Sequence, residues 1–189
     1  MLEGSICVPS AAGDWLRDGL GWIEDAADRA ALAESVASNA DVYVGPALTG
    51  VGAPYWDPYA RGVMVGLTRG TTRAHLVWAA LESMASQVTD VARVMSRESG
   101  VALTELRADG GAVSNAFLMQ FQADVLGVPV SVPPISETPA FGTAALAGLA
   151  EGLWPSAADL PRCQKGRQRY DARSARPQAE HHMVHSFEA

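Results

Sequence analysis

Apolar side chains recur every three or four positions between residues 72 and 97, which is the clearest helical pattern in the chain. Thr71 or Thr72 supplies a hydroxyl at the expected N-cap, and Gly100 follows the last turn, where helices commonly end in glycine. The sequence therefore predicts one long helix whose wide apolar face packs against the core. Six positions form this face: Val77, Leu81, Met84, Val88, Val91 and Met95.

Shorter apolar runs alternate with helical patterns along the rest of the chain. Five runs have the length and composition of strands: residues 2–8, 41–46, 62–67, 105–108 and 128–132. Four segments have helical spacing: residues 11–20, 26–36, 114–126 and 140–153. The run at 62–67 is apolar throughout, which is typical of a buried strand. This order predicts an α/β fold with a mostly parallel sheet flanked by helices.

Composition narrows the class of protein. Of the 189 residues 48% are apolar and 19% are charged, as in an ordinary globular domain. The formal net charge of -7 argues against nucleic-acid binding. No apolar run approaches the ~20 residues that span a bilayer and no signal-peptide pattern opens the chain, so we expect a cytoplasmic protein. Cys7 and Cys163 are too few for a disulfide framework and lack metal-ligand spacing.

The first candidate for chemistry is the sequence Asp109-Gly110-Gly111, between a predicted strand and a helix that begins near Ser114. Paired glycines at a strand end let the backbone approach a ligand closely, and the start of the next helix offers free N–H groups to a phosphate. A tight turn without a ligand would have the same spacing. The sequence therefore allows both interpretations.

Other segments are equally ambiguous. Tyr55, Trp56 and Tyr59 form either a ligand wall or a set of aromatics packed locally or at an interface. The small residues at 138–148 indicate either a site or tight helix packing. After Trp154 the periodicity fades into a polar tail. Its basic residues are predicted to be solvated and its histidines to be exposed, with a binding patch and a metal site as the alternatives: Arg162, Lys165, Arg167, Arg169, His181, His182 and His185.

Five blocks, taken in order, resemble the C-terminal domain of glycerol kinases in the FGGY carbohydrate kinase family. They are LEGSICV…WLRDGLG, GPALTGVGAPYWDPYARGVMVGLTRGTT, HLVWAALESMASQVTDV, LRADGGAVSNAFLMQFQADVLGVPV and FGTAALAGLAEGLW. GAPYWDPYARG is the block that separates glycerol kinases from other sugar kinases of this family. The resemblance implies an actin-like ATPase domain of RNase H-like topology at residues 1–155, truncated at its N-terminal strands. Residues 156–189 would be a C-terminal tail.

The resemblance also implies an ATP site in which this domain grips the adenosine. Gly111, with Gly110 before it, would approach the phosphates through its backbone, and Asn115, one turn into the next helix, would contact the adenine. A second nucleotide-contacting stretch usually has a glycine and a glutamine where this chain has Ser10 and Asp14. The Asp14 carboxylate would either weaken ATP binding, unless a cation lies between them, or point to solvent.

From the activity of this family we expect ATP- and Mg²⁺-dependent phosphorylation of glycerol. The catalytic aspartate, the metal ligands and most glycerol contacts belong to the family's N-terminal half, which these residues do not match, so we nominate no catalytic or metal-binding residue here. A sheet without its opening strands would expose unpaired backbone groups to another chain.

We therefore expect the product of a truncated or split gene. Its partners would be ATP or ADP, glycerol through the other half, and an N-terminal kinase fragment or a homo-oligomer. Two alternatives stay open. The chain is a non-catalytic remnant or partner-binding fragment, or it is half of a kinase for another polyol or sugar.

Overall fold

The computed structural model describes residues 11–25, 28–135, 137–164 and 166–173. The predicted strand at residues 2–8, Ser10 and the three tail histidines lie outside these ranges. The helices are α1 (Ala11–Asp14), α2 (Asp28–Glu34), α3 (Arg73–Ser99), α4 (Ala116–Leu126) and α5 (Thr138–Ala150). Three shorter helical turns are η1 (Trp15–Gly19), η2 (Gly111–Ser114) and η3 (Ala157–Gln164). The strands are β1 (Tyr43–Gly45), β2 (Val63–Val65), β3 (Leu106–Arg107), β4 (Val130–Val132) and β5 (Gln168–Tyr170).

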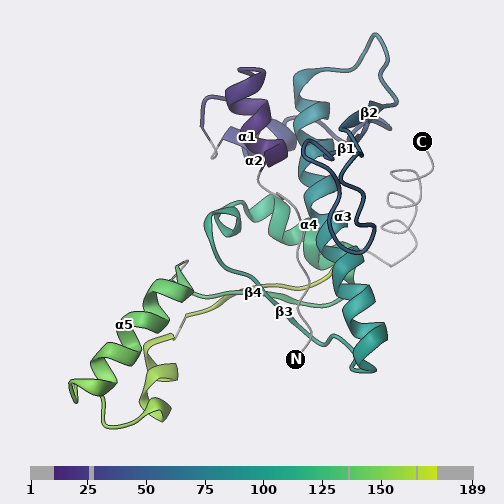
Figure 1. The fold of residues 1–189 in the computed structure, drawn as a ribbon. Coiled ribbons are helices and arrows are strands. Elements are labelled where there is room, and N and C mark those ends of the chain that lie inside the picture. Colours follow the sequence, from purple (N-terminus) through teal and green to yellow (C-terminus); the bar gives the residue numbers. More distant parts are fainter. Residues whose placement is uncertain (1–10, 26–27, 136, 165, 174–189) are drawn as a thin grey trace.

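α3 is the central element, and the prediction of a long helix is confirmed (Figure 1). Thr72 is its N-cap, and the backbone N–H of Thr72 donates to Nδ1 of His75 at 2.9 Å. Gly100 ends the helix with a left-handed φ of 68°. Four of the six predicted apolar positions are buried and the other two, Val88 and Met95, are half-buried.

The main core lies between α3 and α4, with η1 and the strands β3 and β4 around it. Its buried members come from elements far apart in sequence: Leu16, Val77, Leu81, Met84, Val113, Leu118, Met119, Val130 and Val132. A smaller cluster joins β1 to the start of α3 through Val42, Val44 and Leu76. Burial of these side chains, each worth about 1.5–3 kcal/mol, fixes the positions of η2, α4 and β4, which border the candidate site.

The strands form two small sheets, and the expected predominance of parallel pairing is not found among the described residues. β3 is parallel to β4, whereas β4 pairs antiparallel with β5 and β1 pairs antiparallel with β2. The difference has two causes. β1 and β2 form a separate hairpin-like pair, and β5 comes from the segment beyond residue 155 that we expected to be a tail. Polar composition hid this strand, since Tyr170 is its one side chain packed against the core.

Gly62–Leu67 was predicted as a buried strand, and this prediction is wrong in its burial. β2 occupies its centre, but Val63 is 47% exposed and Leu67 57% exposed. Within the described residues β2 pairs only with β1, so it forms an edge with one face open to solvent. A continuous apolar run does not distinguish an exposed edge strand from a buried central one.

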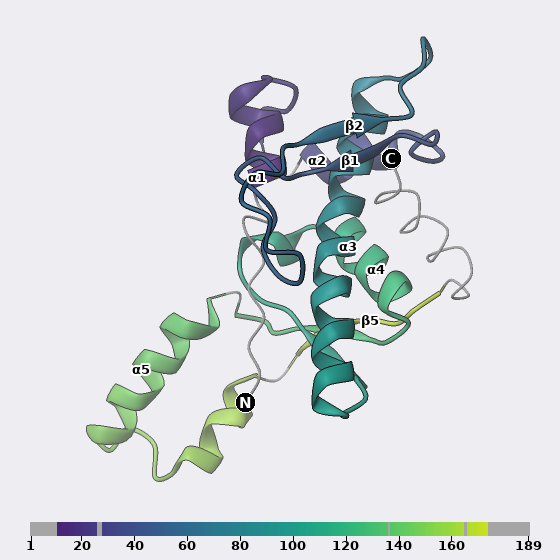
Figure 2. The same ribbon diagram turned by 45° about the vertical axis from the view of Figure 1, so that its right-hand side comes forward.

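α5 and η3 project away from the rest of the molecule as an arm (Figures 1 and 2). The predicted close approach of a neighbour occurs within the arm itself. The indole of Trp154 packs directly over Gly148, where any Cβ would overlap it. Leu146 and Leu153 stay exposed at 69% and 74%.

Candidate functional site

The turn after β3 has the geometry that its sequence requires. Leu106 and Ala108 donate backbone hydrogen bonds to the β4 side, at 2.9 Å to Pro129 O and 3.0 Å to Ser131 O. Gly110 then adopts φ 86° and ψ -177°, a conformation essentially restricted to glycine. This residue redirects the chain from the carboxyl end of β3 into η2.

Gly110 and Gly111 face open space. A Cβ added to either residue would meet no heavy atom within 4 Å, so no neighbouring side chain requires a glycine at these positions. Gly111 has no left-handed φ, so its backbone does not require glycine either. A glycine that neither packing nor φ demands is typical of a backbone that a ligand approaches closely.

Asn115 lies between η2 and α4, not one turn into the helix as expected. It is the N-cap of α4, where its Oδ1 accepts a hydrogen bond from Leu118 N at 3.0 Å. The glycine turn inserts a short 3₁₀ segment first, which delays the α-helix to Ala116. The half-buried amide still has its Nδ2 group, which makes no hydrogen bond to the other described residues.

Asp14 does not stand alone at the end of α1. Its Oδ1 lies 3.3 Å from Nη2 of Arg29 and 3.5 Å from Nη2 of Arg17. The Asp14 side chain is 45% exposed, whereas that of Arg29 is only 12% exposed. Two arginines thus flank this carboxylate, and both alternatives for it, weaker ATP binding and a side chain that points to solvent, stay predictions.

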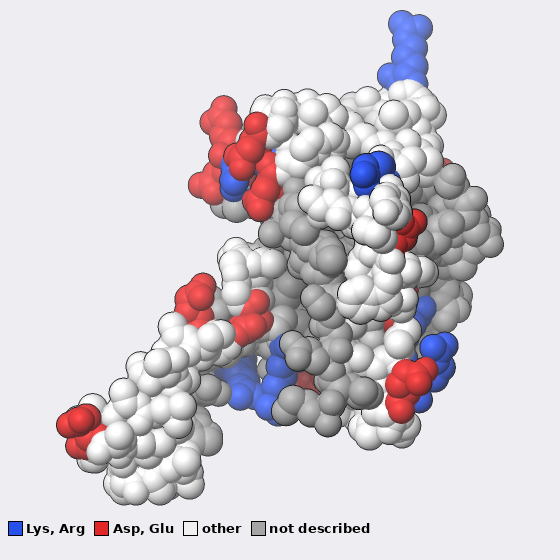
Figure 3. Space-filling model, in the orientation of Figure 1, with Lys and Arg blue, Asp and Glu red and all other residues white. Residues whose placement is uncertain are grey.

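η1, which follows α1 directly, reaches the main core beside the glycine turn. Leu16, one turn after Ala12, shares the main core with Val113 of η2 and Leu118 of α4. In Figure 3 acidic side chains gather over α1 and α2, and the surface is hollowed between them and the arm. The shared core links η1 to the segment that holds Gly110, Gly111 and Asn115, and a common site that includes Asp14 stays a prediction.

A pocket of about 260 Å³ opens at the carboxyl ends of β3 and β4, beside the glycine turn. The Thr138 hydroxyl at the start of α5 donates a hydrogen bond to the Asp109 carboxylate there. The pocket is lined by Arg107, Ala108, Asp109, Ser131, Pro133, Thr138 and Arg167. Of these residues the sequence interpretation had singled out only Asp109, Arg167 and the segment that contains Thr138.

Glu82 is a buried carboxyl that the sequence interpretation missed, because it lies within the apolar pattern of α3. Its oxygens accept hydrogen bonds from Trp78 Nε1 at 2.6 Å and from Asn39 Nδ2 at 2.8 Å. Burial raises the pKa of Glu82 to about 7, although both hydrogen bonds act in the opposite direction. Trp78 in turn contacts Phe117 edge-on, with ring centroids 4.8 Å apart. Glu82 thus connects Asn39, which precedes β1, with Trp78. Through Trp78 it is also linked to Phe117 at the start of α4.

The aromatic loop does not show the local packing that was one of its two interpretations. Trp56 and Tyr59 are 69% and 82% exposed, and Tyr55 is 52% exposed. The Tyr55 hydroxyl donates a long hydrogen bond of 3.4 Å to Asp90 on α3. Burial raises the pKa of Asp90, and burial also raises the pKa of Tyr55. An interface or a ligand wall stays open as the role of this loop.

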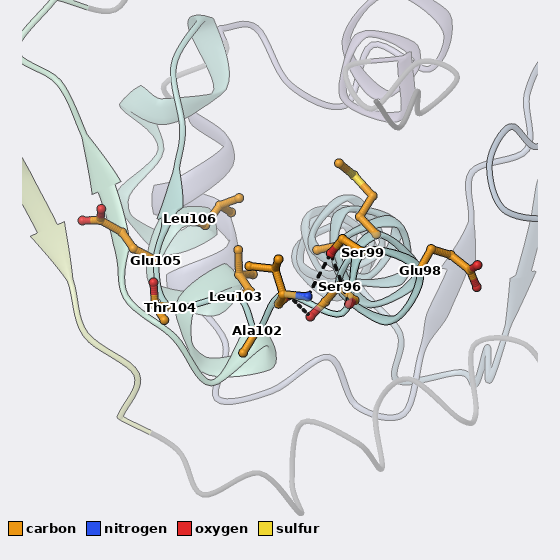
Figure 4. A pocket seen from close by; sticks show the side chains of 11 residues that line it. Ser96, Glu98, Ser99, Ala102, Leu103, Thr104, Glu105 and Leu106 are labelled. Atoms are coloured by element: carbon orange, nitrogen blue, oxygen red, sulfur yellow. Dashed lines mark hydrogen bonds between the residues drawn. The ribbon is translucent and has the colours of Figure 1, made fainter. Parts of the chain in front are cut away.

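A second cavity, the α3–β3 groove, lies between the C-terminal part of α3 and residues 101–106 (Figure 4). Its volume is about 690 Å³, and its floor is largely apolar. Leu103 and Leu106 point toward α3, whereas Glu105 points away. Ser96 closes one end by donating a hydrogen bond of 2.7 Å to Val101 O. Val101 is 68% exposed.

Comparison with known proteins identifies the family. Residues 1–151 match the family model for the FGGY family of carbohydrate kinases, C-terminal domain. The chain therefore belongs to the FGGY family of carbohydrate kinases.

Glycerol kinases are among its relatives within that family. The chain is 59% identical to the glycerol kinase of Symbiobacterium thermophilum over 159 residues, which are 84% of this chain and 32% of that protein. It is 58% identical to glycerol kinase 2 of Thermotoga maritima over 153 residues, which are 81% of this chain and 31% of that protein. The chain thus spans about a third of the length of the curated relatives that it matches.

Solved structures confirm the α/β, actin-like ATPase fold. Plasmodium falciparum glycerol kinase with ADP superposes with a TM-score of 0.86 at 27% identity, covering 96% of this chain and 36% of that one. Xylulose kinase from Lactobacillus acidophilus gives a TM-score of 0.75 at 22% identity, covering 98% of this chain and 37% of that one. The second likeness concerns the fold alone.

Proposed function

We propose that this chain is the nucleotide-side part of an ATP-dependent glycerol kinase, and that ATP or ADP binds at the turn formed by Gly110 and Gly111. The observation that carries the proposal is the open space in front of both glycines, at the carboxyl end of a parallel strand pair. Ligands in α/β sheets commonly bind outside the carboxyl ends of such strands. The similarity to glycerol kinases, one of them solved with ADP, supports the nature of the ligand.

Each residue of the turn has a distinct part in this proposal. Gly110 and Gly111 bring backbone N–H groups to the phosphates, which a Cβ on Gly111 would obstruct. Nδ2 of Asn115 donates to a ring nitrogen of the adenine while Oδ1 caps α4, so the helix itself orients the amide. These groups bind and orient the nucleotide. None of them is proposed to transfer a proton.

Phosphoryl transfer needs further groups. Mg²⁺ bridges the phosphates of ATP in such reactions and neutralises the charge that develops on them. Within the part of the chain that the structure describes, no three His, Cys, Asp or Glu side chains are grouped so that they could hold a metal ion. These described residues therefore do not fit a metal site, and we derive no step through the metal. We propose that the base, the metal ligands and most glycerol contacts come from other segments of the kinase.

The α3–β3 groove supports the proposal that this chain joins another kinase segment. Among the described residues β3 pairs only with β4. Leu106 and Ala108 direct their backbone groups to β4, so Glu105 and Arg107 direct theirs to the opposite side. An edge strand beside an apolar groove favours the addition of an extended segment. The same features would serve a non-catalytic partner-binding fragment, which is the second candidate function.

Two measurements separate these candidates. Thermal unfolding with and without ADP tests nucleotide binding: at an ADP concentration of about 100 Kd we expect the midpoint to rise by about 5–10 °C. Co-expression with the N-terminal segment of a glycerol kinase then tests the enzyme, with glycerol 3-phosphate as the measured product. No ADP-dependent shift would reject the nucleotide site. A shift without product on co-expression would favour the partner-binding fragment.

No helix among the described residues is long and apolar enough to cross a membrane. We propose a cytoplasmic location on the strength of the sequence pattern alone.

A further inference from the structure

The carboxylates around α1 pose a physical problem for the proposed nucleotide site. Residues 14–28 carry five acidic side chains, Asp14, Asp18, Glu24, Asp25 and Asp28, and four of them are exposed. Asp14 is the one on α1 itself, two residues before Leu16, which shares the main core with Val113 of the glycine turn. A nucleotide phosphate bound at that turn would be repelled by an unpaired carboxylate at the end of α1.

Two arginines lie near Asp14, but they are not equivalent. Arg17 is engaged by Asp18, to which its Nε and Nη2 both donate hydrogen bonds of 2.7 Å. That pair lowers the pKa of Asp18 through the hydrogen bonds from Arg17. Within the described residues the ion pair of Arg29 is with Asp14 alone, and its side chain is almost buried. Arg29 is therefore the guanidinium available to offset the charge of Asp14.

The surrounding residues make room for Arg29 specifically. Its guanidinium lies against Gly13, where a Cβ would come within 2.7 Å of Cζ. Its Nε is buried without a hydrogen-bond partner. A buried donor left unpaired destabilises the folded chain, so this arrangement is a poor way to gain stability. It does place a positive charge 3.3 Å from the Asp14 carboxylate, on a side chain that is less exposed than that of Asp14.

We propose that Arg29 is a positioning residue of the nucleotide site: its buried guanidinium neutralises Asp14, so that α1 can border a bound polyanion. This inference rests on the proposed nucleotide-binding function. In this proposal α2 supplies, through Arg29, a cation that offsets the charge of Asp14. Because Gly13 has no side chain, the Arg29 guanidinium can lie against it and reach the Asp14 carboxylate.

A double-mutant cycle with ADP titration tests the inference. Arg29→Gln removes the charge, and we expect ADP to bind about three- to tenfold more weakly because Asp14 is then unpaired. In the Asp14→Asn background the same Arg29→Gln change should alter the Kd by less than about twofold. The penalty in Arg29→Gln alone should shrink as NaCl rises from about 0.05 M to about 0.5 M, because salt screens the repulsion.

Controls keep the outcomes distinct. Arg97→Gln removes an exposed ion pair with Glu98 at the far end of α3 and should leave the Kd unchanged. If Arg29→Gln weakens ADP binding equally in both backgrounds, or not at all, the inference is overturned. If Arg29→Gln does not fold, Arg29→Lys and Arg29→Met are compared instead, and equal affinities would overturn it. Absence of ADP binding by the unmodified chain would instead reject the proposed function.

Discussion

At the residue scale, Gly111 is the position where the proposed ligand, and not the fold, accounts for a glycine. Its backbone conformation suits any residue and the space in front of it is open, so packing does not explain a glycine. Gly110 differs, because its φ of 86° and extended ψ would strain any side chain. The pair of glycines was visible in the sequence, but which of them serves the backbone and which the ligand required the structure.

Gly111→Ala is therefore expected to change the unfolding midpoint by less than about 2 °C while abolishing most of the ADP-dependent shift. Thermal unfolding with and without ADP measures both. Gly142→Ala is the matched control, since its Cβ would also meet open space but lies on the arm. A Gly111→Ala protein with an undiminished ADP shift would remove the basis of the proposed site.

Glu82 gives the chain a predicted pH dependence. Its folded pKa of about 7 lies above the ordinary value of 4.5, so the protonated form favours folding. Its contribution is fully present below about pH 4.5 and is lost as the pH rises through 7, a total of about 3 kcal/mol. Glu82→Gln should flatten this part of the profile when the free energy of unfolding is measured by denaturant titration between pH 5 and pH 8.

The control for that measurement is Glu98→Gln, which changes an exposed glutamate on the same helix. It should keep the slope of the unmodified chain. Equal slopes in Glu82→Gln and the unmodified chain would show that Glu82 is ionised at little cost.

At the element scale, α4 depends on Asn115 for its start and the proposed site depends on the same amide for recognition. Asn115→Asp keeps a cap oxygen for Leu118 N but loses the Nδ2 donor. We expect the unfolding free energy to change by less than about 0.5 kcal/mol and ADP affinity to fall at least about tenfold. Asn115→Ala should lose both, including about 1 kcal/mol of stability. If both variants bind ADP as tightly as the unmodified chain, the role of Asn115 is limited to capping α4.

β5 was the element that the sequence did not predict, and its contacts explain why it forms. Gln120 Nε2 donates to Asp171 O at 2.8 Å, and Arg173 N donates to Asp124 Oδ1 at 2.6 Å. Both bonds tie the strand to α4 over a separation of about fifty residues, which no local pattern encodes. The long α3, by contrast, was predicted almost to the residue, because its cap, its apolar face and its terminal glycine are all local signals.

Tyr170→Ala tests the contribution of β5 to the sheet. The half-buried ring packs against the core and pairs in register with Val130, so its loss should cost about 2 kcal/mol in denaturant unfolding. Gln168→Ala, on an exposed position of the same strand, is the control and should cost less than about 0.5 kcal/mol. If both substitutions have the same small effect, β5 does not stabilise the sheet.

At the scale of the whole molecule, the family was readable from ordered sequence blocks, whereas the shape of the surface was not. The sequence placed Gly110, Gly111 and Asn115 in one segment, and the fold linked η1 to that segment through the shared core. The α3–β3 groove arises from residues that are apolar but unpatterned, so only the three-dimensional arrangement reveals it.

Leu103→Asp places a charge in the α3–β3 groove without touching the main core, and Leu103 is only half-buried. If another kinase segment docks there, product formation in the co-expression assay should fall by more than about tenfold, because a charge would have to be buried. Leu146→Asp, on the exposed face of α5, is the control. Undiminished product in Leu103→Asp would place the contact elsewhere.

The arm has a consequence for how this chain can be rebuilt. Val132 and Gln168 face each other in the register of β4 and β5, so everything between them leaves and re-enters the sheet at adjacent points. Two neighbouring antiparallel strands can be joined by a turn of two residues such as Asn-Gly. A shortened gene that swaps residues 133–167 for such a turn would preserve the strand pairing and discard the arm. The connection between β4 and β5 is thus a site at which one inserted segment can be replaced by another.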